Sequence, residues 1–450
     1  MTEAIARYCA SQPTLSTAVQ NEVQNHLLDW IGLVTGGRIY ARSSKSVLQT
    51  IDALTESDLP RGIPIGRSIA PDKAALLAGT LAHSLDFDDT HRSSSVHPGA
   101  PVIAAALPVA ATNESDSTEF LEAISLGYDV TCALGRAVDP DSHYARGFHL
   151  TATCGTFGAT AAVGHLNGFD AETFEMAFGI NGSQAAGSLQ FLENGAWNKR
   201  LHPGLAAQRA IYAGELAASS FRGSESPITG EFGFFHGYTD TPHPEKLENI
   251  EPGRAVQETA LKPYPCCRYM HAGIDGLLSI AREVDIDEIQ QIEIDLPNPG
   301  VRLTGSPIER KRRPENFVDC QFSAPFAAAL AVTTGEASLH AFLDAQDRLS
   351  DPVLCEMMDR VIVRSTDRTN EPFPDQWTAH VIVEADERHE RFISHPPGEP
   401  ERPLDPETIE AKFDELITES PLRNRADAIT ETVSALGSRT ELGELLALLE

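Results

Sequence analysis

The sequence predicts a mostly α-helical protein, in which a large helical domain is built from both ends of the chain and a smaller α+β domain is inserted between them. Apolar residues recur at helical spacing through the first 260 residues. From Lys262 onward, β-branched runs alternate with Pro, Gly and Asp, and a helical pattern returns after Pro403. The predicted boundaries are 1–261 with 403–450 for the helical domain and 262–402 for the α+β domain. A chain of 450 residues is long enough for two domains of this kind.

The helical domain is expected to contain several long helices. The spacing of apolar residues predicts one from Leu15 to Val34, which Gly36 and Gly37 are expected to end. Asp116 has the spacing of a capping box with the glutamate three residues later, so another helix is predicted to begin there. Further helices are predicted at 153–164, 171–186 and 205–219, where Ala and Gly would let helices approach closely. No strand-like alternation interrupts this part of the chain.

The α+β domain is expected to hold strands at 291–296, 360–364 and 380–384, because these runs are β-branched and bounded by turn-forming residues. Helical patterns lie between them at 322–334 and 338–342. The Pro-rich segment 396–406 predicts a linker back to the helical domain, where helices are predicted at 407–416 and 425–449.

The composition limits the classes of partner and the cellular setting. Asp and Glu number 65 against 35 Lys and Arg, and the formal net charge of -30 argues against binding to nucleic acid or to an anionic membrane surface. An acidic chain with so few lysines is typical of proteins that work in concentrated salt, so a halophilic cytoplasm is expected. The chain starts without a secretory signal pattern and has no long apolar run. The seven cysteines show neither a disulfide framework nor a metal-binding spacing.

Islands of polar residues interrupt the apolar pattern. The densest runs from His83 to Gly99, in a stretch that otherwise has the pattern of a buried helix. Others lie at 146–153, 198–204 and 262–271. Burying so many ionisable groups costs several kcal/mol each unless they are paired or used. Together the islands therefore predict one assembled active site.

Four motifs in these islands resemble the MmgE/PrpD family, which includes 2-methylcitrate dehydratases, cis-aconitate decarboxylases and iminodisuccinate epimerases. In chain order they are Ala82-His-Ser-Leu-Asp-Phe-Asp-Asp-Thr-His91 with His97-Pro-Gly99, Gly147-Phe-His-Leu-Thr-Ala-Thr153, Lys199-Arg-Leu-His-Pro-Gly204 and Lys262-Pro-Tyr-Pro-Cys-Cys-Arg-Tyr-Met-His271. The resemblance covers essentially the whole chain. It implies a helical domain with an α/β lid, a homodimer, and proton transfer at carbon atoms beside carboxylates without a metal or organic cofactor.

The resemblance to cis-aconitate decarboxylases also implies roles for individual residues. His97 is the leading general acid or base, because imidazole titrates nearest to neutral pH, and His149 is the second candidate. Asp86, also placed among the catalytic residues, would with Thr90 orient His97 or bind a substrate hydroxyl. Three cationic residues would bind the substrate carboxylates: Lys199, Lys262 and Arg268.

The function implied is that of a cofactor-free lyase that dehydrates or decarboxylates a small di- or tricarboxylate. Two departures keep the substrate open. Phe322 stands where cis-aconitate decarboxylases have a tyrosine, and the loop from Thr90 to His97 is one residue longer. The sequence around His149 also differs from the 2-methylcitrate dehydratase branch.

Other functions remain compatible with the same residues. An epimerase acting on an amino- or imino-dicarboxylate would use the same acid and base groups. A metal-dependent hydrolase or cyclase would instead use His83, Asp86, Asp89 and His97, with the first three on one helix face and His97 on a loop before Pro98. A third class is a carboxylate-binding protein without catalysis.

Several polar residues also have purely structural interpretations. Asp88 and Asp89 could cap a helix or pair with Arg92. His83, His91 and His271 could be hydrogen-bonded core residues or part of the site. The His202-Pro203-Gly204 sequence is interpreted as a turn at the start of a helix, and the neighbouring Cys266 and Cys267 as packing residues.

Overall fold

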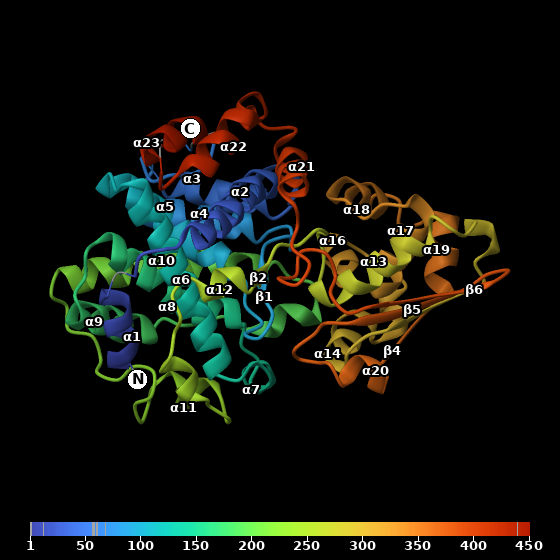
Figure 1. Ribbon diagram of the computed structural model, residues 1–450, viewed down its shortest axis with the longest axis horizontal. Helices are drawn as coiled ribbons and strands as arrows, with labels where there is room; N and C mark the ends of the chain where they lie inside the picture. The colour runs from blue at the N-terminus through green and yellow to red at the C-terminus, as the bar shows by residue number, and fades with distance from the viewer. Residues whose placement is uncertain (1, 12, 56–58, 60–61, 68, 439) are drawn as a thin grey trace. The chain divides into compact units, whose positions relative to one another are not determined.

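The computed structural model describes residues 2–11, 13–55, 59, 62–67, 69–438 and 440–450. They form two compact units, Met1–Ala260 with Asp405–Glu450, and Leu261–Leu404 (Figure 1). Helices account for 60% of the residues and strands for 7%, which confirms the predicted mostly α class. The first unit is helical and contains both ends of the chain, and the second combines helices with a sheet.

Helix α8 (Leu150–Leu166) lies at the centre of the helical unit, where every one of its residues is buried. It packs against α5, α6, α9 and α10. A Cβ atom at Gly158 would lie 1.8 Å from Thr131 Oγ1 and 2.4 Å from the Gly127 carbonyl, so only glycine allows α6 and α8 to approach this closely. The helices of this unit are α1 (Thr2–Ala10), α2 (Thr17–Tyr40), α3 (Ser44–Ala53), α4 (Pro71–Ala82), α5 (Gly99–Asn113), α6 (Ser117–Ala137), α7 (Pro140–Ala145), α8, α9 (Ala171–Gly182), α10 (Asn198–Ala218), α11 (Phe234–Tyr238), α12 (Arg254–Gln257), α21 (Pro406–Ile417), α22 (Ala426–Ala435) and α23 (Leu442–Leu449).

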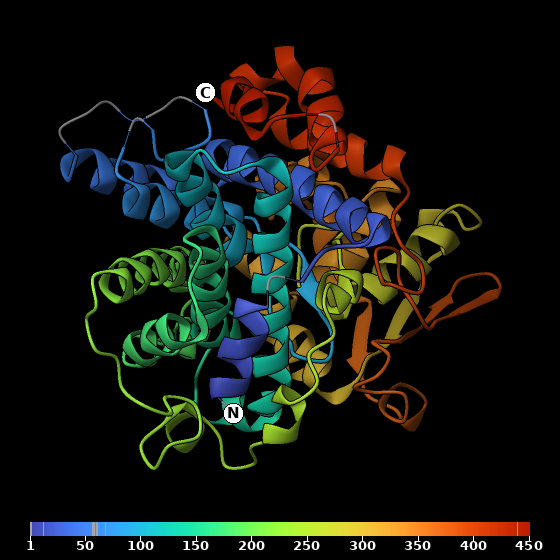
Figure 2. The ribbon, with the colours of Figure 1, turned by 60° about the vertical axis from the view of Figure 1, so that its left-hand side comes forward.

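The long helix α2 joins the two ends of the chain into one unit. It lies beside the C-terminal helices α21 and α22, as the blue and red segments of Figure 2 show. The prediction that Gly36 and Gly37 end α2 is wrong, because the helix continues to Tyr40. A Cβ atom at Gly37 would lie 2.1 Å from the Leu81 carbonyl, and one at Gly36 would lie 2.5 Å from a methyl group of Leu416. These glycines therefore permit close helix contacts rather than a stop.

Other helix boundaries also depend on local chemistry. The Asp116 side chain accepts hydrogen bonds from the Thr118 and Glu119 amides, so the predicted helix start at α6 is confirmed. The single C-terminal helix predicted at 425–449 is wrong, since α22 and α23 are separate and Gly437 between them has φ +74°. The absence of strands predicted for the first 260 residues is also wrong. A short antiparallel ribbon pairs β1 (Thr90–His91) with β2 (Thr259–Ala260).

The described strands of the second unit form a mixed sheet in the order β4-β3-β5-β6. Strand β3 is parallel to β4 and antiparallel to β5, and β5 and β6 form a hairpin. The three predicted strands correspond to β3, β4 and β5, whereas β6 was not predicted because charged residues alternate along it. Helix α13 packs on β5 and β6, and α17 packs on β4 (Figure 1). The bounds are β3 (Gln291–Asp295), β4 (Val361–Arg364), β5 (Ala379–Glu384), β6 (Arg388–Ile393), α13 (His271–Ile280), α14 (Asn298–Gly300), α15 (Ile308–Lys311), α16 (Phe317–Gln321), α17 (Ala324–Thr334), α18 (Leu339–Gln346), α19 (Pro352–Asp359) and α20 (Asp367–Asn370).

Within the described residues, no single helix combines the length and the apolar character needed to cross a membrane. The bent pair α17 and α18 meets those two criteria only when both helices are taken together, across a bend of 107°.

Candidate functional site

The residues of the polar island that precede Gly99 form a non-helical connection between two buried helices, and this connection contains the short strand β1. Helix α4 ends at Ala82, and α5 begins at Gly99. The prediction of a helix through this stretch is wrong, and His83, Asp86 and Asp89 do not share a helix face. Asp86 adopts a left-handed backbone conformation with φ +51°, which a helix could not accommodate. The prediction that His97 lies on a loop before Pro98 is confirmed.

Asp89 ties this loop to the helical core. Its carboxylate accepts hydrogen bonds from Tyr128 Oη at 2.5 Å and from the Gly99 amide at 3.1 Å, and it lies 3.0 Å from His26 Nδ1. The Gly99 contact places a negative charge at the N-terminus of α5, where the helix dipole favours it. Asp89 therefore fits the structural interpretation of a capping residue.

A buried lysine from the C-terminal part of the chain holds the same loop. Lys412 on α21 forms an ion pair with Asp29 on α2 at 2.6 Å and donates a hydrogen bond to the Phe87 carbonyl at 2.9 Å. Its ammonium group also lies 3.9 Å from the centre of the Phe87 ring. Burial raises the pKa of Asp29, although the nearby Lys412 charge opposes that shift. The two ends of the chain thus fix the loop jointly.

The hydrogen bonds of His97 determine which of its ring nitrogens is available for chemistry. Its Nδ1 lies 2.7 Å from the Asp89 carbonyl oxygen and 3.4 Å from Thr90 Oγ1. A carbonyl oxygen can only accept a hydrogen bond, so Nδ1 carries the hydrogen. In the neutral ring, Nε2 therefore holds the lone pair and is the nitrogen that can accept a proton. The backbone amide of His97 donates to Thr151 Oγ1 at 3.0 Å, which fixes the ring's attachment point.

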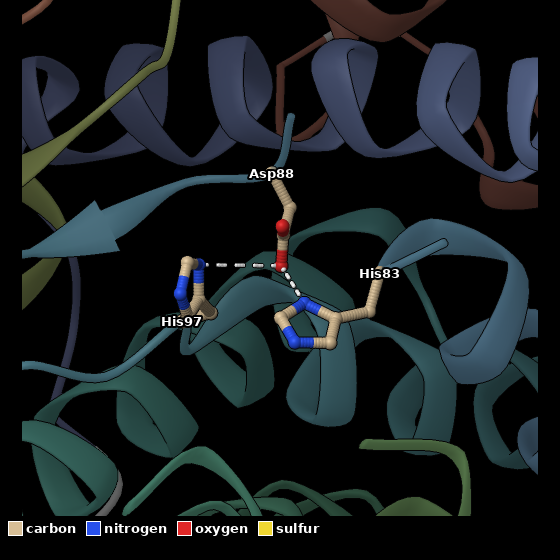
Figure 3. Close-up of side chains that lie close together, drawn as sticks. All are labelled: His83, Asp88 and His97. Atoms are coloured by element: carbon tan, nitrogen blue, oxygen red, sulfur yellow. Dashed lines mark hydrogen bonds and ion pairs between the residues drawn. The ribbon is translucent and has the colours of Figure 1, made fainter. Parts of the chain in front are cut away.

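Asp88 bridges two histidines with one carboxylate oxygen. Its Oδ2 lies 2.6 Å from His83 Nδ1 and 3.5 Å from His97 Nδ1, as the dashed lines in Figure 3 show. The rings of His83 and His97 meet edge to face, with centres 4.9 Å apart. The Asp88 carboxylate thus faces the Nδ1 side of both rings. It can stabilise the positive charge that His97 gains when Nε2 takes up a proton.

The same three residues are also the group that could hold a metal ion, since their candidate ligand atoms all lie within 4.8 Å of one another. This is not the set predicted, because Asp86 and Asp89 contact other partners. Zinc ligands lie about 2.0 to 2.1 Å from the ion, so neighbouring ligand atoms stand further apart than the 2.6 Å between His83 Nδ1 and Asp88 Oδ2. That separation, and the bond from His97 to a carbonyl, favour a hydrogen-bonded group over a metal centre.

Lys199 and Asp86 form an ion pair in which both side chains are largely buried. Lys199 lies in the first turn of α10, and Asp86 comes from the loop after α4. An ammonium group has three donors, so Lys199 can keep Asp86 and still bind a substrate carboxylate. The neighbouring Arg200 is also buried; burial lowers the pKa of its guanidinium to about 10, against the opposing effect of Asp86.

His149 lies next to this cluster at the start of α8. Its ring stacks on His83 with centres 5.8 Å apart, and its Nδ1 lies 3.1 Å from Nδ1 of His202. His202 does not lie in a turn before a helix, as predicted, but inside α10. Burial, followed by repulsion from the protonated forms of His202, His83, Lys199 and His97, holds the pKa of His149 well below its usual range.

Two predicted substrate-binding residues, Lys262 and Arg268, belong to the second unit. Lys262 is 1% exposed. Arg268 forms a buried ion pair with Glu399 and stacks over the Trp377 ring at 5.1 Å. Its charge is therefore balanced within its own unit. Phe322, where a tyrosine was noted in relatives, directly follows α16, and its carbonyl accepts a hydrogen bond from Lys311.

The remaining histidines divide into structural and site residues. His91 contacts Ser94 at 2.6 Å and Glu258 at 3.5 Å, and His271 contacts the Cys266 carbonyl at 3.2 Å, so both fit the core interpretation. His83 instead lies at the site. Sequence reasoning left His83 open between a core and a site role, and it favoured structural roles for Asp88 and His202, although all three are in motifs that the resemblance quoted.

Comparison with known proteins covers both units. Residues 3–247 match the MmgE/PrpD N-terminal domain, and residues 264–437 match the MmgE/PrpD C-terminal domain. The chain belongs to the MmgE/PrpD family. The resemblance drawn from the four motifs is thereby confirmed.

Several curated members of this family are similar over most of the chain. The cis-aconitate decarboxylase-like protein oryM of Aspergillus oryzae is 24% identical over 431 residues, which cover 90% of this chain and 88% of that protein. The cis-aconitate decarboxylase of Aspergillus terreus is 22% identical over 412 residues, which cover 86% of this chain and 83% of that protein. The human cis-aconitate decarboxylase is 25% identical over 308 residues, which cover 65% of this chain and 61% of that protein. These relatives support a lyase-like enzyme at the level of the MmgE/PrpD family.

Proposed function

We propose that this MmgE/PrpD protein is a cofactor-free lyase that decarboxylates or dehydrates a small di- or tricarboxylate, with His97 as the acid and base. The observation that carries the proposal is the hydrogen bond from His97 Nδ1 to the Asp89 carbonyl, which places the hydrogen on Nδ1 and the lone pair on Nε2, the atom proposed to exchange a proton with the substrate. The substrate class is supported by relatives named cis-aconitate decarboxylases.

In a decarboxylation, the bond between the substrate carbon and its carboxylate breaks, CO₂ leaves, and the electron pair stays on carbon. His97 would then protonate that carbon from Nε2. In a dehydration, a base removes the proton beside the carboxylate while an acid protonates the departing hydroxyl. His97 and His149 are the two imidazoles proposed for these steps. Thr90, whose hydroxyl lies 3.4 Å from His97 Nδ1, and Asp86 are proposed to orient the reacting groups.

Lys199 is proposed to bind the carboxylate beside the reacting carbon, where negative charge develops. Its pairing with Asp86 keeps the ammonium group oriented before substrate arrives. Lys262 is proposed as the second carboxylate ligand and Arg268 as a third, although Glu399 already neutralises Arg268. A cationic pocket is needed because the protein as a whole carries a net charge of -30.

Two other functions have a specific basis. Epimerisation beside a carboxylate needs the same removal and return of a proton, so His97 and His149 would serve it equally. A metal-dependent hydrolase or cyclase would use the cluster of His83, Asp88 and His97, whose ligand atoms lie close enough together to be candidates for a metal site. The hydrogen-bonded geometry of that cluster makes it the weaker proposal.

One panel of substrates separates these reactions. Citrate, methylcitrate, cis-aconitate and iminodisuccinate are incubated with the protein in high salt. Alkene absorbance reports dehydration, CO₂ release reports decarboxylation, and deuterium uptake at the carbon beside the carboxylate reports epimerisation. We expect turnover of a citrate-like or aconitate-like acid. The absence of all three signals, with ligand binding retained, would instead support a carboxylate-binding protein.

We also propose a cytoplasmic homodimer, as the family resemblance implies. Tyr212, Leu216 and Phe221 are large apolar side chains with exposed fractions of 51%, 38% and 55%, and exposed apolar surface of this kind often marks an interface between chains. Light scattering at the working salt concentration tests the dimer. A monomer at micromolar concentration would contradict it.

A further inference from the structure

Two buried histidines meet through the same ring nitrogen at the edge of the site. His149 Nδ1 and His202 Nδ1 are 3.1 Å apart, with exposed fractions of 3% and 8% for the two residues. The Phe191 ring lies beside both imidazoles, with its centre 6.2 Å from the centre of the His149 ring and 6.0 Å from that of the His202 ring. His149 directly precedes α8 and His202 lies in α10, so the contact depends on how those helices pack.

The surrounding backbone leaves little freedom to this pair. The His149 amide donates a hydrogen bond to the Gly187 carbonyl at 2.8 Å. A Cβ atom at Gly187 would lie 2.5 Å from the Ala152 side chain and 3.3 Å from His202 Nδ1. Only glycine therefore fits beside the two rings, and the hydrogen bond between them is enclosed by protein.

Both rings are neutral near neutral pH. Burial lowers the pKa of His202 to about 4 and holds the pKa of His149 well below its usual range. The titratable groups whose charges act on the pair are His83, His97 and Lys199 on the His149 side, and His83, Lys199 and Arg209 on the His202 side. A proton added to either ring would be repelled by Lys199, and at His202 also by Arg209.

A hydrogen bond between two neutral imidazoles imposes a rule on their tautomers. Each ring carries one hydrogen, and the bond needs one Nδ1 with a hydrogen and one Nδ1 with a lone pair. The donating ring then keeps a lone pair on Nε2, and the accepting ring carries its hydrogen on Nε2. Two equal tautomers would place two lone pairs or two hydrogens against each other at 3.1 Å.

We propose that His202 is a positioning residue that sets the tautomer of His149 and so decides whether Nε2 of His149 accepts or donates a proton during the reaction. This inference rests on the proposed function, in which His149 is the second acid or base. His202 needs no contact with substrate for this role, because it acts only through its hydrogen bond to His149.

Three substitutions of His202 separate a tautomer role from simple packing. His202→Asn places an amide near the position of Nδ1, and rotation of that amide offers either a donor or an acceptor to His149. His202→Leu offers neither. His202→Asp offers only an acceptor near neutral pH, so the hydrogen should be fixed on Nδ1 of His149. Circular dichroism and the melting temperature check that each variant folds.

The first readout is the ¹⁵N spectrum of the histidine rings, with the His149 signals assigned from a His149→Gln variant. We expect one tautomer of His149 in the wild type, a mixture in His202→Leu, and hydrogen on Nδ1 alone in His202→Asp. If His202→Leu does not fold, the Asp variant decides. The proposal is overturned if His149 keeps its lone pair on Nδ1 in the His202→Asp variant. It is also overturned if a folded His202→Leu variant shows the same single tautomer as the wild type.

The second readout is kinetic and uses whichever acid the substrate panel identifies. His202→Leu should lower kcat about 10-fold or more with little change in KM, since orientation of an acid or base acts on the chemical step. His202→Asn should restore kcat to within about 3-fold of the wild type. Wild-type kcat in the Leu variant contradicts the proposal. An unchanged kcat in His149→Gln would instead remove His149 from the proposed function and leave the ¹⁵N result standing.

Discussion

Replacing Asp88 by Asn should slow the enzyme without unfolding it. The amide oxygen of Asn can still accept the hydrogen bond from His83, but the negative charge 3.5 Å from His97 Nδ1 disappears. A unit charge at that distance interacts with an imidazolium by at most ~5 kcal/mol at an effective dielectric constant of about 20. Part of that energy is offset by desolvation, so the expected net loss is about 1.5 to 3 kcal/mol. This corresponds to a decrease in kcat/KM of roughly 10- to 150-fold.

The pH profile provides the sign of the effect. The Asp88 carboxylate favours the protonated form of His97. Its removal should therefore shift the part of the kcat/KM–pH curve that depends on the protonation of His97 to lower pH. Asp89→Asn is the matched control, because this neighbouring carboxylate contacts Tyr128 and the start of α5 and should chiefly lower the melting temperature. A folded Asp88→Asn protein with wild-type kcat/KM and an unmoved pH profile would refute the reasoning.

Four further results are expected. His97→Gln should stay folded by circular dichroism and lose turnover by about 10² or more; wild-type turnover would exclude it from the mechanism. Lys199→Met and Lys262→Met should each cost about 1.5 to 3 kcal/mol in kcat/KM at the working salt concentration, and no change in either would place the carboxylate ligand elsewhere. EDTA should leave activity intact, whereas loss that a divalent ion restores would favour the metal-dependent function. Burial raises the pKa of Asp129 to about 7, so the folded state holds a proton that the unfolded state releases, and the free energy of unfolding should fall as pH rises from about 4 to about 7. An Asp129→Asn protein with the same pH dependence in denaturant titrations would contradict that assignment.

Elements whose signals are local could be predicted from the sequence. Asp116 caps α6 through its own side chain, and the β-branched runs at β3 to β5 have the pattern of buried strands. The predictions fail where a contact with a residue far along the chain determines the structural role of a residue. Gly36 and Gly37 resemble a helix stop, but they are needed because α4 and α21 approach α2 there. Strand β6 alternates between exposed and half-buried residues without an apolar face, so only its pairing with β5 defines it.

In the candidate site too, local signals could be predicted from the sequence and distant contacts could not. The sequence indicates that the island from His83 to Gly99 is unusual, because its ionisable residues are dense in an apolar context. It cannot distinguish Asp88 from Asp89, which are adjacent and chemically identical. In the fold, one faces two histidines and the other faces Tyr128 and His26, residues 39 and 63 positions away in the chain. His202 gains its importance in the same way, from a partner on another helix.

The charges around the candidate site in the helical unit favour proton uptake by His97 when an anionic substrate binds. Lys199 is neutralised by Asp86, and His149 and His202 are uncharged. The Asp88 carboxylate faces His97, with its Oδ2 3.5 Å from His97 Nδ1. A substrate carboxylate at Lys199 adds further negative charge and so favours proton uptake at His97, whose Nε2 holds the lone pair. In the proposed decarboxylation, the anionic substrate would thus promote the His97 imidazolium that is proposed to protonate the carbon after CO₂ leaves.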